Sequence, residues 1–366
     1  MTQEALITVE NFRNIVKAQM HPVGLCAFTG PSGSGKTSFL DAVAMATAVA
    51  GTTPRLRTHD YNGQASKARS SSVSIDVGAD KWSVSRRDEH ASWDAESIHA
   101  KGRSFSYHHD RDDEKRKKQD VEEYPSLRDL LKRVLGVAVL RSNRDRWESV
   151  AYPEAIASDD SDVPLDRSGL LARFRLWQRY EHRDRFSWTI ETMRALFPDI
   201  DYIDVFDPPK ERKGALGSNY SYISQAPSFV RVVRDGGNLL SNLEEERSSV
   251  IRSLEVIAAV ARMDSGDVLF VEEIERGLDP FTLGTLLSRL DDRAESRGLN
   301  IVIETQSRSV LSFFQNCTES IFVMENGRIS PLSELVDPSW TATYKIGDIY
   351  GSAYGRSPYL VTKEAP

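Results

Sequence analysis

Hydrophobic and polar positions divide the chain into alternating strand-like and helix-like segments. Apolar runs of strand length, several of them bounded by turn-forming residues, predict strands. These runs cover residues 5–15, 23–29, 72–77, 82–87, 136–140, 200–206, 268–273, 300–305 and 320–329. Helical spacing or alanine-rich composition predicts helices over 39–50, 126–135, 166–197, 241–261 and 282–296. Strands and helices that alternate in this way predict an α/β fold.

Composition narrows the class of protein. A chain of 366 residues with 40% hydrophobic and 28% charged residues can bury a large core, in one two-lobed domain or in two domains. A net charge of −7 argues against a generally basic nucleic-acid coat and still permits a local basic groove. No apolar run approaches the roughly 20 residues that span a bilayer, and the first residues lack a secretory signal. We therefore expect a cytoplasmic protein that does not enter a membrane.

Two cysteines, Cys26 and Cys317, lie in apolar, strand-like runs. This placement predicts buried thiols in a reducing compartment, with neither a disulfide nor a metal site.

A glycine-rich stretch joins the predicted strand 23–29 to the helix that follows. It fits the phosphate-binding pattern G-x-x-x-x-G-K-[S/T] with Gly30, Pro31, Ser32, Gly33, Ser34, Gly35, Lys36 and Thr37. Backbone amides of such a loop and the helix N-terminus bind phosphate oxygens. We expect Lys36 to reach the β and γ phosphates of ATP, Thr37 to ligate Mg²⁺, and Ser38 to complete the nucleotide-binding set.

Two acids follow the apolar run 268–271, as in the second motif of P-loop NTPases. Glu272 is predicted to hold Mg²⁺, directly or through water, and Glu273 to polarise the attacking water. Aspartate is more usual at the first position, but the longer glutamate can still reach a magnesium-bound water. Two merely exposed acids at a strand end are the alternative, which the phosphate loop disfavours.

The spacing of the two motifs indicates the class of NTPase. Lys36 and Glu272 are 236 residues apart, whereas small GTPases and ring ATPases keep these motifs much closer. An inserted lobe of this size is typical of ABC-type heads. The prediction is a two-lobed head with a central mixed or parallel sheet. Residues 1–100 and 262–366 would form the nucleotide-binding lobe, and 101–261 the inserted helical lobe.

Three further elements would complete a site shared by two copies. Leu278-Asp279 stands where a loop contacts the partner subunit, and Gln306 follows the strand that senses the γ-phosphate. Residues 240–244, LSNLE, look like a degenerate form of the signature L-S-G-G-[Q/E]. Ser241 could then bind the partner's γ-phosphate from a helix N-terminus. Alternatively, Ser241 and Glu244 form a capping box and need no ligand.

Together these segments resemble the RecF/SMC/OLD branch of ABC-type ATPases. Its motifs are similar to VENFRNI (9–15), TGPSGSGKTSFLD (29–41), EEIERGLDP (272–280) and ETQS (304–307). The resemblance implies ATP and Mg²⁺ as cofactors and adds Arg13 to the nucleotide-binding set. It also implies a homodimer or higher homo-oligomer formed through the ATP sites. Stand-alone heads of this kind work with a separately encoded effector in bacterial phage defence.

The sequence is compatible with three functions. The leading hypothesis is an ATPase that dimerises around ATP and gates an effector protein. The alternatives are a DNA-repair or chromosome-maintenance ATPase that clamps duplex DNA, and a nucleotide-locked scaffold with little turnover. Salt-dependent DNA binding would favour the second function, and ATP binding without hydrolysis the third.

Two charged segments have no assigned role. In residues 101–119 acids alternate with bases, which favours a solvated face over a nucleic-acid contact or a metal site at His108-His109. Arg141, Arg144 and Arg146 follow the predicted strand 136–140 and could sense phosphate or DNA, or lie on the surface.

Overall fold

The apolar runs of strand length assemble into a mostly parallel sheet in a computed structural model of the chain. Its strand order is β17-β16-β3-β15-β14-β8. Neighbouring strands pair in parallel, except that β16 and β17 are antiparallel. β3 is buried along its whole length, which explains its apolar sequence. The strands are β3 (Leu25–Thr29), β8 (Val137–Leu140), β14 (Val268–Glu272), β15 (Asn300–Glu304), β16 (Ile321–Glu325) and β17 (Arg328–Pro331). The predicted α/β fold with a central mixed sheet is therefore confirmed.

A second, antiparallel sheet has the order β2-β1-β4-β5-β6-β7. Burial alternates along β1, where Ala5, Ile7 and Val9 face the core. Its strands are β1 (Ala5–Phe12), β2 (Ile15–Met20), β4 (Ser71–Val77), β5 (Asp80–Arg86), β6 (Asp94–Ala100) and β7 (Arg103–Tyr107). β4 and β5 confirm the predicted hairpin.

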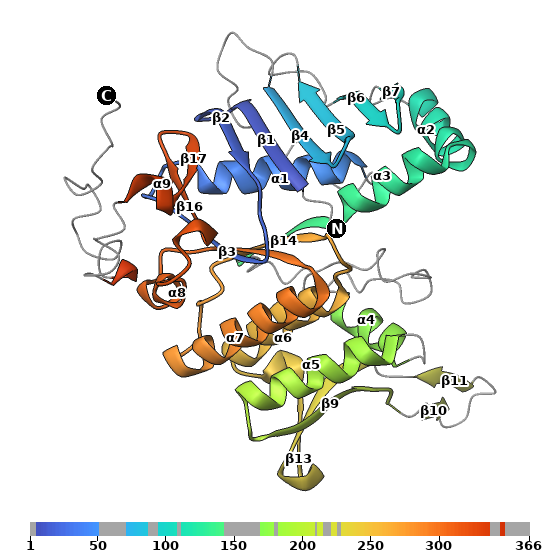
Figure 1. The fold of residues 1–366 in the computed structure, drawn as a ribbon. Coiled ribbons are helices and arrows are strands. Elements are labelled where there is room, and N and C mark those ends of the chain that lie inside the picture. Colours follow the sequence, from blue (N-terminus) through green and yellow to red (C-terminus); the bar gives the residue numbers. More distant parts are fainter. Residues whose placement is uncertain are drawn as a thin grey trace. The chain divides into compact units, whose positions relative to one another are not determined.

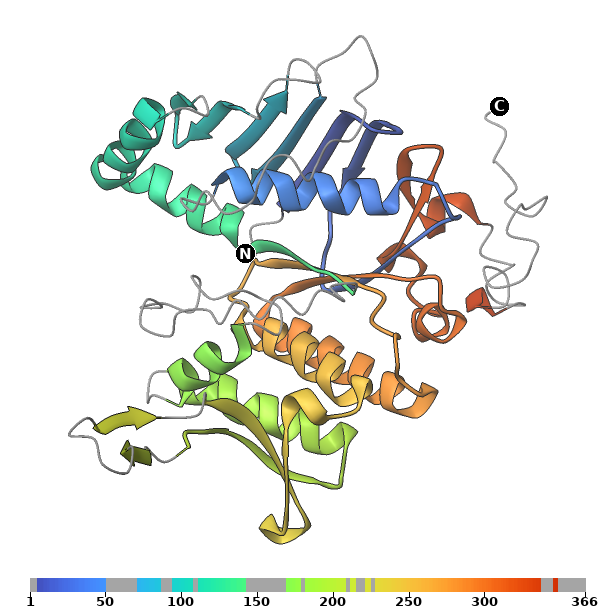
Figure 2. The same cartoon turned by 180° about the vertical axis from the view of Figure 1, so that it is seen from behind.

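Helix α1 (Lys36–Ala50) packs against both sheets. It contacts β1 and β4 of the antiparallel sheet and β8 of the parallel one. Figures 1 and 2 view the molecule from opposite sides, and both show α1 running along the sheet face formed by β1, β4 and β5. The Phe39 ring lies 5.7 Å from that of Phe28 on β3 and 6.2 Å from that of Phe270 on β14. This apolar core fixes the first turn of α1 beside the ends of the parallel strands.

The contacts between residues divide the chain into two compact units. Unit 1 comprises Met1–Ser142, Met263–Glu275 and Leu287–Pro366, and unit 2 comprises Asn143–Arg262 and Arg276–Leu286. The structure describes residues 5–50, 71–86, 94–107, 111–142, 169–178, 182–208, 211–214, 221–224, 228–336 and 345–347. In these ranges no helix is both long and apolar enough to cross a membrane. Arg144, Arg146, His108 and His109 lie outside them.

The predicted lobe boundary after residue 100 is too early. β8 pairs in parallel with β14, so residues 101–142 belong to unit 1. The helices that complete unit 1 are α2 (Arg111–Glu123), α3 (Pro125–Leu135), α8 (Arg308–Phe313), η7 (Thr318–Ser320), α9 (Leu332–Leu335) and the end of α7 (Pro280–Arg297). Sequence spacing could not show this pairing, because the strand partners are distant in the chain.

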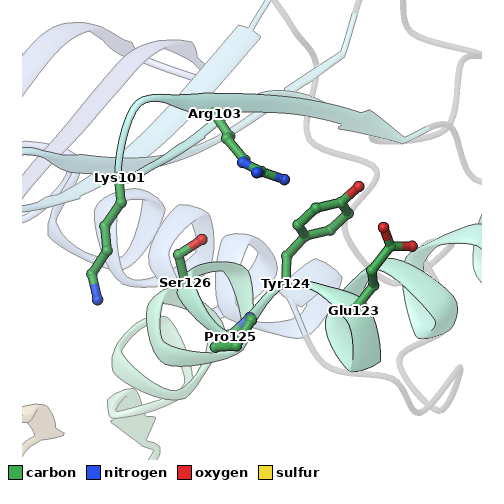
Figure 3. A pocket seen from close by; sticks show the side chains of 6 residues that line it. All are labelled: Lys101, Arg103, Glu123, Tyr124, Pro125 and Ser126. Carbon is green, nitrogen blue, oxygen red and sulfur yellow. The ribbon is translucent and has the colours of Figure 1, made fainter.

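The described part of the charged segment 101–123 forms β7 and α2, and its side chains contact one another and the adjoining helix α3. An open pocket next to it is lined by Lys101, Arg103, Glu123, Tyr124, Pro125 and Ser126 (Figure 3). The Arg103 guanidinium lies 4.6 Å from the centre of the Tyr124 ring, and Lys101 Nζ lies 3.8 Å from Asp129 Oδ2. Tyr107 donates a hydrogen bond of 2.7 Å to Asp120. These charges pair within unit 1.

Unit 2 combines helices with a small antiparallel sheet, and the strand predicted over 200–206 is confirmed as β9 in this sheet. The sheet order is β13-β12-β9, and α5 packs against both α6 and β9 (Figure 1). The elements are α4 (Leu170–Trp177), α5 (Arg183–Leu196), β9 (Ile200–Phe206), β10 (Glu211–Gly214), β11 (Ser221–Ser224), β12 (Phe229–Arg234), η5 (Asp235–Gly237), β13 (Leu239–Asn242), η6 (Leu243–Glu245) and α6 (Ser248–Arg262). The predicted helices within 166–197 are confirmed as α4 and α5.

The helix predicted over 241–261 begins seven residues later, at Ser248. Residues 239–242 instead pair with β12 as a strand, and the Asn242 side chain accepts a hydrogen bond from Glu244 N at the start of η6. Ser241 is therefore not a helix cap. Cys26 is buried as predicted, but Cys317 is exposed, because it lies in the turn before η7 and not in β16.

Candidate functional site

The carboxyl ends of four parallel strands meet at one edge of the sheet in unit 1. Glu272 on β14 is in register with Glu304 on β15, which is in register with Phe28 on β3. Val271 is in register with Leu140 at the end of β8. This is the edge where α/β proteins bind ligands. It carries the phosphate loop, the two acids predicted for the site, the predicted switch segment and the segment after β8.

Glycines shape the phosphate loop between β3 and α1. Gly30, Gly33 and Gly35 have φ angles of 147°, 80° and 112°, which side chains disfavour. A Cβ on Gly30 would lie 2.2 Å from the carbonyl oxygen of Met324, so the loop runs directly against the end of β16. Asn14 donates a hydrogen bond of 3.0 Å to the Gly33 carbonyl and supports the loop from the β1–β2 turn.

Lys36 lies inside the loop and is 5% exposed. Its ammonium donates hydrogen bonds to the carbonyls of Gly30 at 2.8 Å and Pro31 at 3.2 Å. Nζ also lies 3.9 Å from Glu304 Oε1. Burial lowers the pKa of Lys36, and the nearby Glu304 carboxylate counteracts this effect. A cation held mainly by neutral carbonyls is suited to receive phosphate oxygens.

Glu304 is a buried acid behind the loop, at 8% exposure. Burial raises its pKa from 4.5 to about 7, Lys36 opposes the rise, and the neighbouring acids Glu272, Glu273 and Glu275 add to it. No role is predicted for Glu304 from the sequence. Its signal was an acid at the end of an apolar strand, the same signal that marks Glu272.

The predicted metal ligand Glu272 and the predicted catalytic acid Glu273 are both held by the segment that follows β8. Glu272 accepts hydrogen bonds from Arg141 at 3.2 Å and from the Ser142 backbone N–H at 3.1 Å. Glu273 is exposed and accepts a hydrogen bond of 2.8 Å from the Ser142 hydroxyl. Its φ of 46° lets the chain turn sharply after β14. The two acids are thus oriented from one short segment, residues 141–142.

A chain of ion pairs extends from Glu272 to the opening strands. Arg141 also pairs with Asp41 on α1, and Asp41 pairs with Arg13 in the β1–β2 turn. Arg13 lies beside the Phe12 ring, 5.4 Å from its centre. The structure thus places Arg13, predicted to bind nucleotide, in contact with the phosphate-loop helix through Asp41. Arg141 is half-buried at this edge of the sheet and is paired with Asp41 and Glu272.

The predicted switch segment is tied to the turn after β14. Thr305 is fully buried and donates a hydrogen bond of 2.7 Å to Glu275. Ser307 N–H in turn donates to the Thr305 hydroxyl at 2.9 Å. Gln306 lies between them with an exposed side chain. Glu275 is engaged here, which leaves Glu273 as the exposed acid next to the strand end.

In unit 2, Ser241 is enclosed by charged neighbours. Its hydroxyl donates to Glu246 and lies 3.3 Å from an Arg234 nitrogen, and Arg234 binds Glu246 through two hydrogen bonds of 2.6 and 2.8 Å. The helix N-terminus that precedes β14 in sequence instead carries Ser248 and Ser249. Gly277, before Leu278-Asp279, approaches Ser248 so closely that a Cβ would lie 3.2 Å from its hydroxyl.

The residues at the sheet edge suit a magnesium nucleotide. The loop has a glycine-lined cradle, and the buried Ser34 hydroxyl oxygen has no hydrogen-bond partner. Ser32 and Thr37 are exposed at the loop and the first turn of α1, with Ser38 half-buried beside them. Among the described residues no group of three His, Cys, Asp or Glu side chains could hold a metal alone. Mg²⁺ usually shares its ligands with substrate phosphates, and Thr37 and Glu272 would hold it here.

Comparisons with known proteins agree with this geometry. Residues 25–312 match the family described as "AAA domain, putative AbiEii toxin, Type IV TA system". No curated protein matches the chain in sequence.

Several solved structures are similar to the chain. A structure of an SMC head bound to the C-winged helix domain of ScpA aligns with a TM-score of 0.52 at 11% identity, covering 90% of this chain and 97% of that chain. An SMC head with an extended coiled coil from Pyrococcus furiosus aligns with a TM-score of 0.48 at 12% identity, covering 90% and 96%. At such identities the first likeness shows a shared fold. The family match covers the phosphate loop and the acid strand, and it shows that this chain belongs to the AAA family described with the putative AbiEii toxin.

Proposed function

We propose that the chain binds ATP with Mg²⁺ at the sheet edge and hydrolyses it there. The observation that supports this is the convergence of the phosphate loop with Glu272 and Glu273 at one edge of the parallel sheet. Lys36 and the loop amides bind the phosphates, and Thr37 and Glu272 hold Mg²⁺. Glu273, exposed and held by Ser142, polarises the attacking water.

The proposal includes closure of two copies around ATP. Leu278-Asp279 lies in a loop preorganised by Asp279, which accepts hydrogen bonds from Phe281 N–H at 2.9 Å and Thr282 N–H at 3.1 Å. Such a rigid, exposed loop is suited to contact a second copy. Because Ser241 lies on β13, the helix N-terminus that would bind the partner's γ-phosphate is that of α6, at Ser248.

The output of the cycle is proposed to be control of a separately encoded effector in bacterial antiphage defence. The family description names a putative toxin of a type IV TA system, and the similar SMC head is bound to a domain of the partner protein ScpA. Both support a head that acts through a partner. Duplex DNA is the alternative target of the same ATP-driven closure.

Two variants test the hydrolytic site. Lys36→Ala should abolish tight ATP binding, because the cation that meets the phosphates is lost. Glu273→Gln should retain ATP binding, lower the turnover rate by orders of magnitude and accumulate an ATP-bound dimer. Glu275→Gln is the matched control, since Glu275 is bound to Thr305. Calorimetry measures binding, phosphate release measures turnover, and light scattering measures mass.

The outcomes separate the candidate functions. Wild-type turnover that falls with Glu273→Gln and persists with Glu275→Gln supports the proposed base. Loss of turnover in Glu275→Gln alone would contradict it. Tight ATP binding with no hydrolysis in the wild type would identify a nucleotide-locked scaffold. Salt-dependent stimulation by duplex DNA would instead identify a DNA-directed ATPase.

A further inference from the structure

Arg141 is shared between two acids of different function. Its guanidinium contacts Asp41 on α1 through one nitrogen and Glu272 on β14 through the other. All three side chains are largely buried, with exposures of 18%, 17% and 14%. Two carboxylates on one fork of a guanidinium form a strong, directional arrangement in a partly desolvated place.

Both oxygens of the Glu272 carboxylate are engaged by this segment. Oε1 accepts from Arg141 at 3.2 Å, and Oε2 accepts from the Ser142 N–H at 3.1 Å. A carboxylate that accepts two such hydrogen bonds is less available as a ligand. Mg²⁺ and a guanidinium are both cations that bind carboxylate oxygens, so they compete for Glu272.

We propose that Arg141 is a positioning residue that latches Glu272 in the nucleotide-free state and yields it when Mg²⁺ arrives with ATP. The inference rests on the proposed function of the site. Asp41 makes the exchange feasible, because Arg141 keeps one buried carboxylate partner after it leaves Glu272. Arg13, the second partner of Asp41, holds that acid in place during the exchange. Mg²⁺ must displace Arg141 from Glu272. The affinity for nucleotide therefore increases less on addition of Mg²⁺ than it would if Arg141 did not contact Glu272.

The test compares the affinity for a fluorescent, non-hydrolysable ATP analogue, mant-AMPPNP, in excess Mg²⁺ and in EDTA. Arg141→Gln is expected to tighten binding in Mg²⁺ about tenfold, because one full charge near Glu272 is removed from a partly screened site. Binding in EDTA should change by less than about twofold. Asp41→Asn should have the opposite effect and weaken binding in Mg²⁺, because Arg141 then loses a carboxylate that competes with Glu272 for its guanidinium.

Arg133→Gln is the matched control. It removes a guanidinium on α3 that pairs with Asp80 on β5 at 2.5 Å in the same unit. Its affinities should equal those of the wild type. Thermal melting establishes that each variant is folded, and Asp41→Asn tests the latch even where Arg141→Gln folds poorly.

The possible results are distinct. Unchanged or weaker binding in Mg²⁺ for Arg141→Gln, or tighter binding for Asp41→Asn, overturns the latch. A loss of affinity confined to EDTA in Arg141→Gln also overturns it, since Arg141 would then contact phosphate itself. A wild type that binds no nucleotide under either condition refutes the proposed function, and the latch with it.

Discussion

Replacing Glu304 with glutamine should remove a pH-dependent loss of stability. Glu304 is buried next to Lys36, and burial raises its pKa from 4.5 to about 7 in the folded protein. Between these two values the folded protein binds more protons than the unfolded chain. Stability associated with this group is therefore present below pH 4.5 and is lost as the pH rises through 7.

The magnitude follows from the two pKa values. A shift of one pKa unit corresponds to about 1.4 kcal/mol, so the full effect is about 3 kcal/mol. Between pH 5 and pH 8 about 2.5 kcal/mol of it should appear. Changes in packing that do not depend on pH add a constant offset to Glu304→Gln, and this offset cancels when the two pH values are compared. The attraction to Lys36 is already included in the pKa of Glu304. The stability of Glu304→Gln relative to the wild type should thus rise by about 2.5 kcal/mol.

Urea denaturation of nucleotide-free protein at pH 5 and pH 8, at one ionic strength, measures this difference. Glu325→Gln is the control, because Glu325 is an exposed acid at the end of β16 in the same sheet. It should follow the wild type at both pH values. Parallel pH profiles for Glu304→Gln and the wild type would show that Glu304 does not carry the raised pKa.

Further predictions concern the loop and the second copy. Gly30→Ala should lower the free energy of unfolding by about 3 kcal/mol, because the added Cβ collides with the backbone of Met324. Gly33→Ala should lower it by about 1 kcal/mol, from backbone strain alone. Equal losses of stability in urea denaturation would contradict the collision. Mixing Lys36→Ala protein with Ser248→Arg protein should restore ATPase activity in heterodimers, since each pair retains one complete site. Ser241→Arg alone should keep its activity if Ser241 has no role in trans, and an inactive mixture after verified subunit exchange would refute the Ser248 assignment.

Local chemistry allowed much of the site to be predicted from sequence. A phosphate loop needs glycines, one lysine and one hydroxyl at fixed spacing, so residues 30–37 specify it without knowledge of distant contacts. The same holds for Glu272 and Glu273, because an apolar run that ends in acids is a local pattern. Parallel strands bring such ends together at one edge, as β3, β15 and β14 do.

Pairing between distant residues was not visible in the sequence. Residues 241–247 have a helical composition and a capping-box spacing. In the structure, however, residues 239–242 pair with β12 as a strand. Cross-strand hydrogen bonds and packing outweigh the weak local preference for a helix. The lobe boundary was misplaced for the same reason, since β8 belongs with β14, which lies more than a hundred residues further along the chain.

Sequence alone therefore determined which groups are predicted to bind phosphate and metal, because those groups act through their own chemistry. The tertiary structure decided how they are controlled. Glu304 acquires its raised pKa from burial beside Lys36, and Arg141 becomes part of the site because β8 ends next to β14 and α1. Burial and charge pairing depend on positions in space, and a sequence pattern records only positions along the chain.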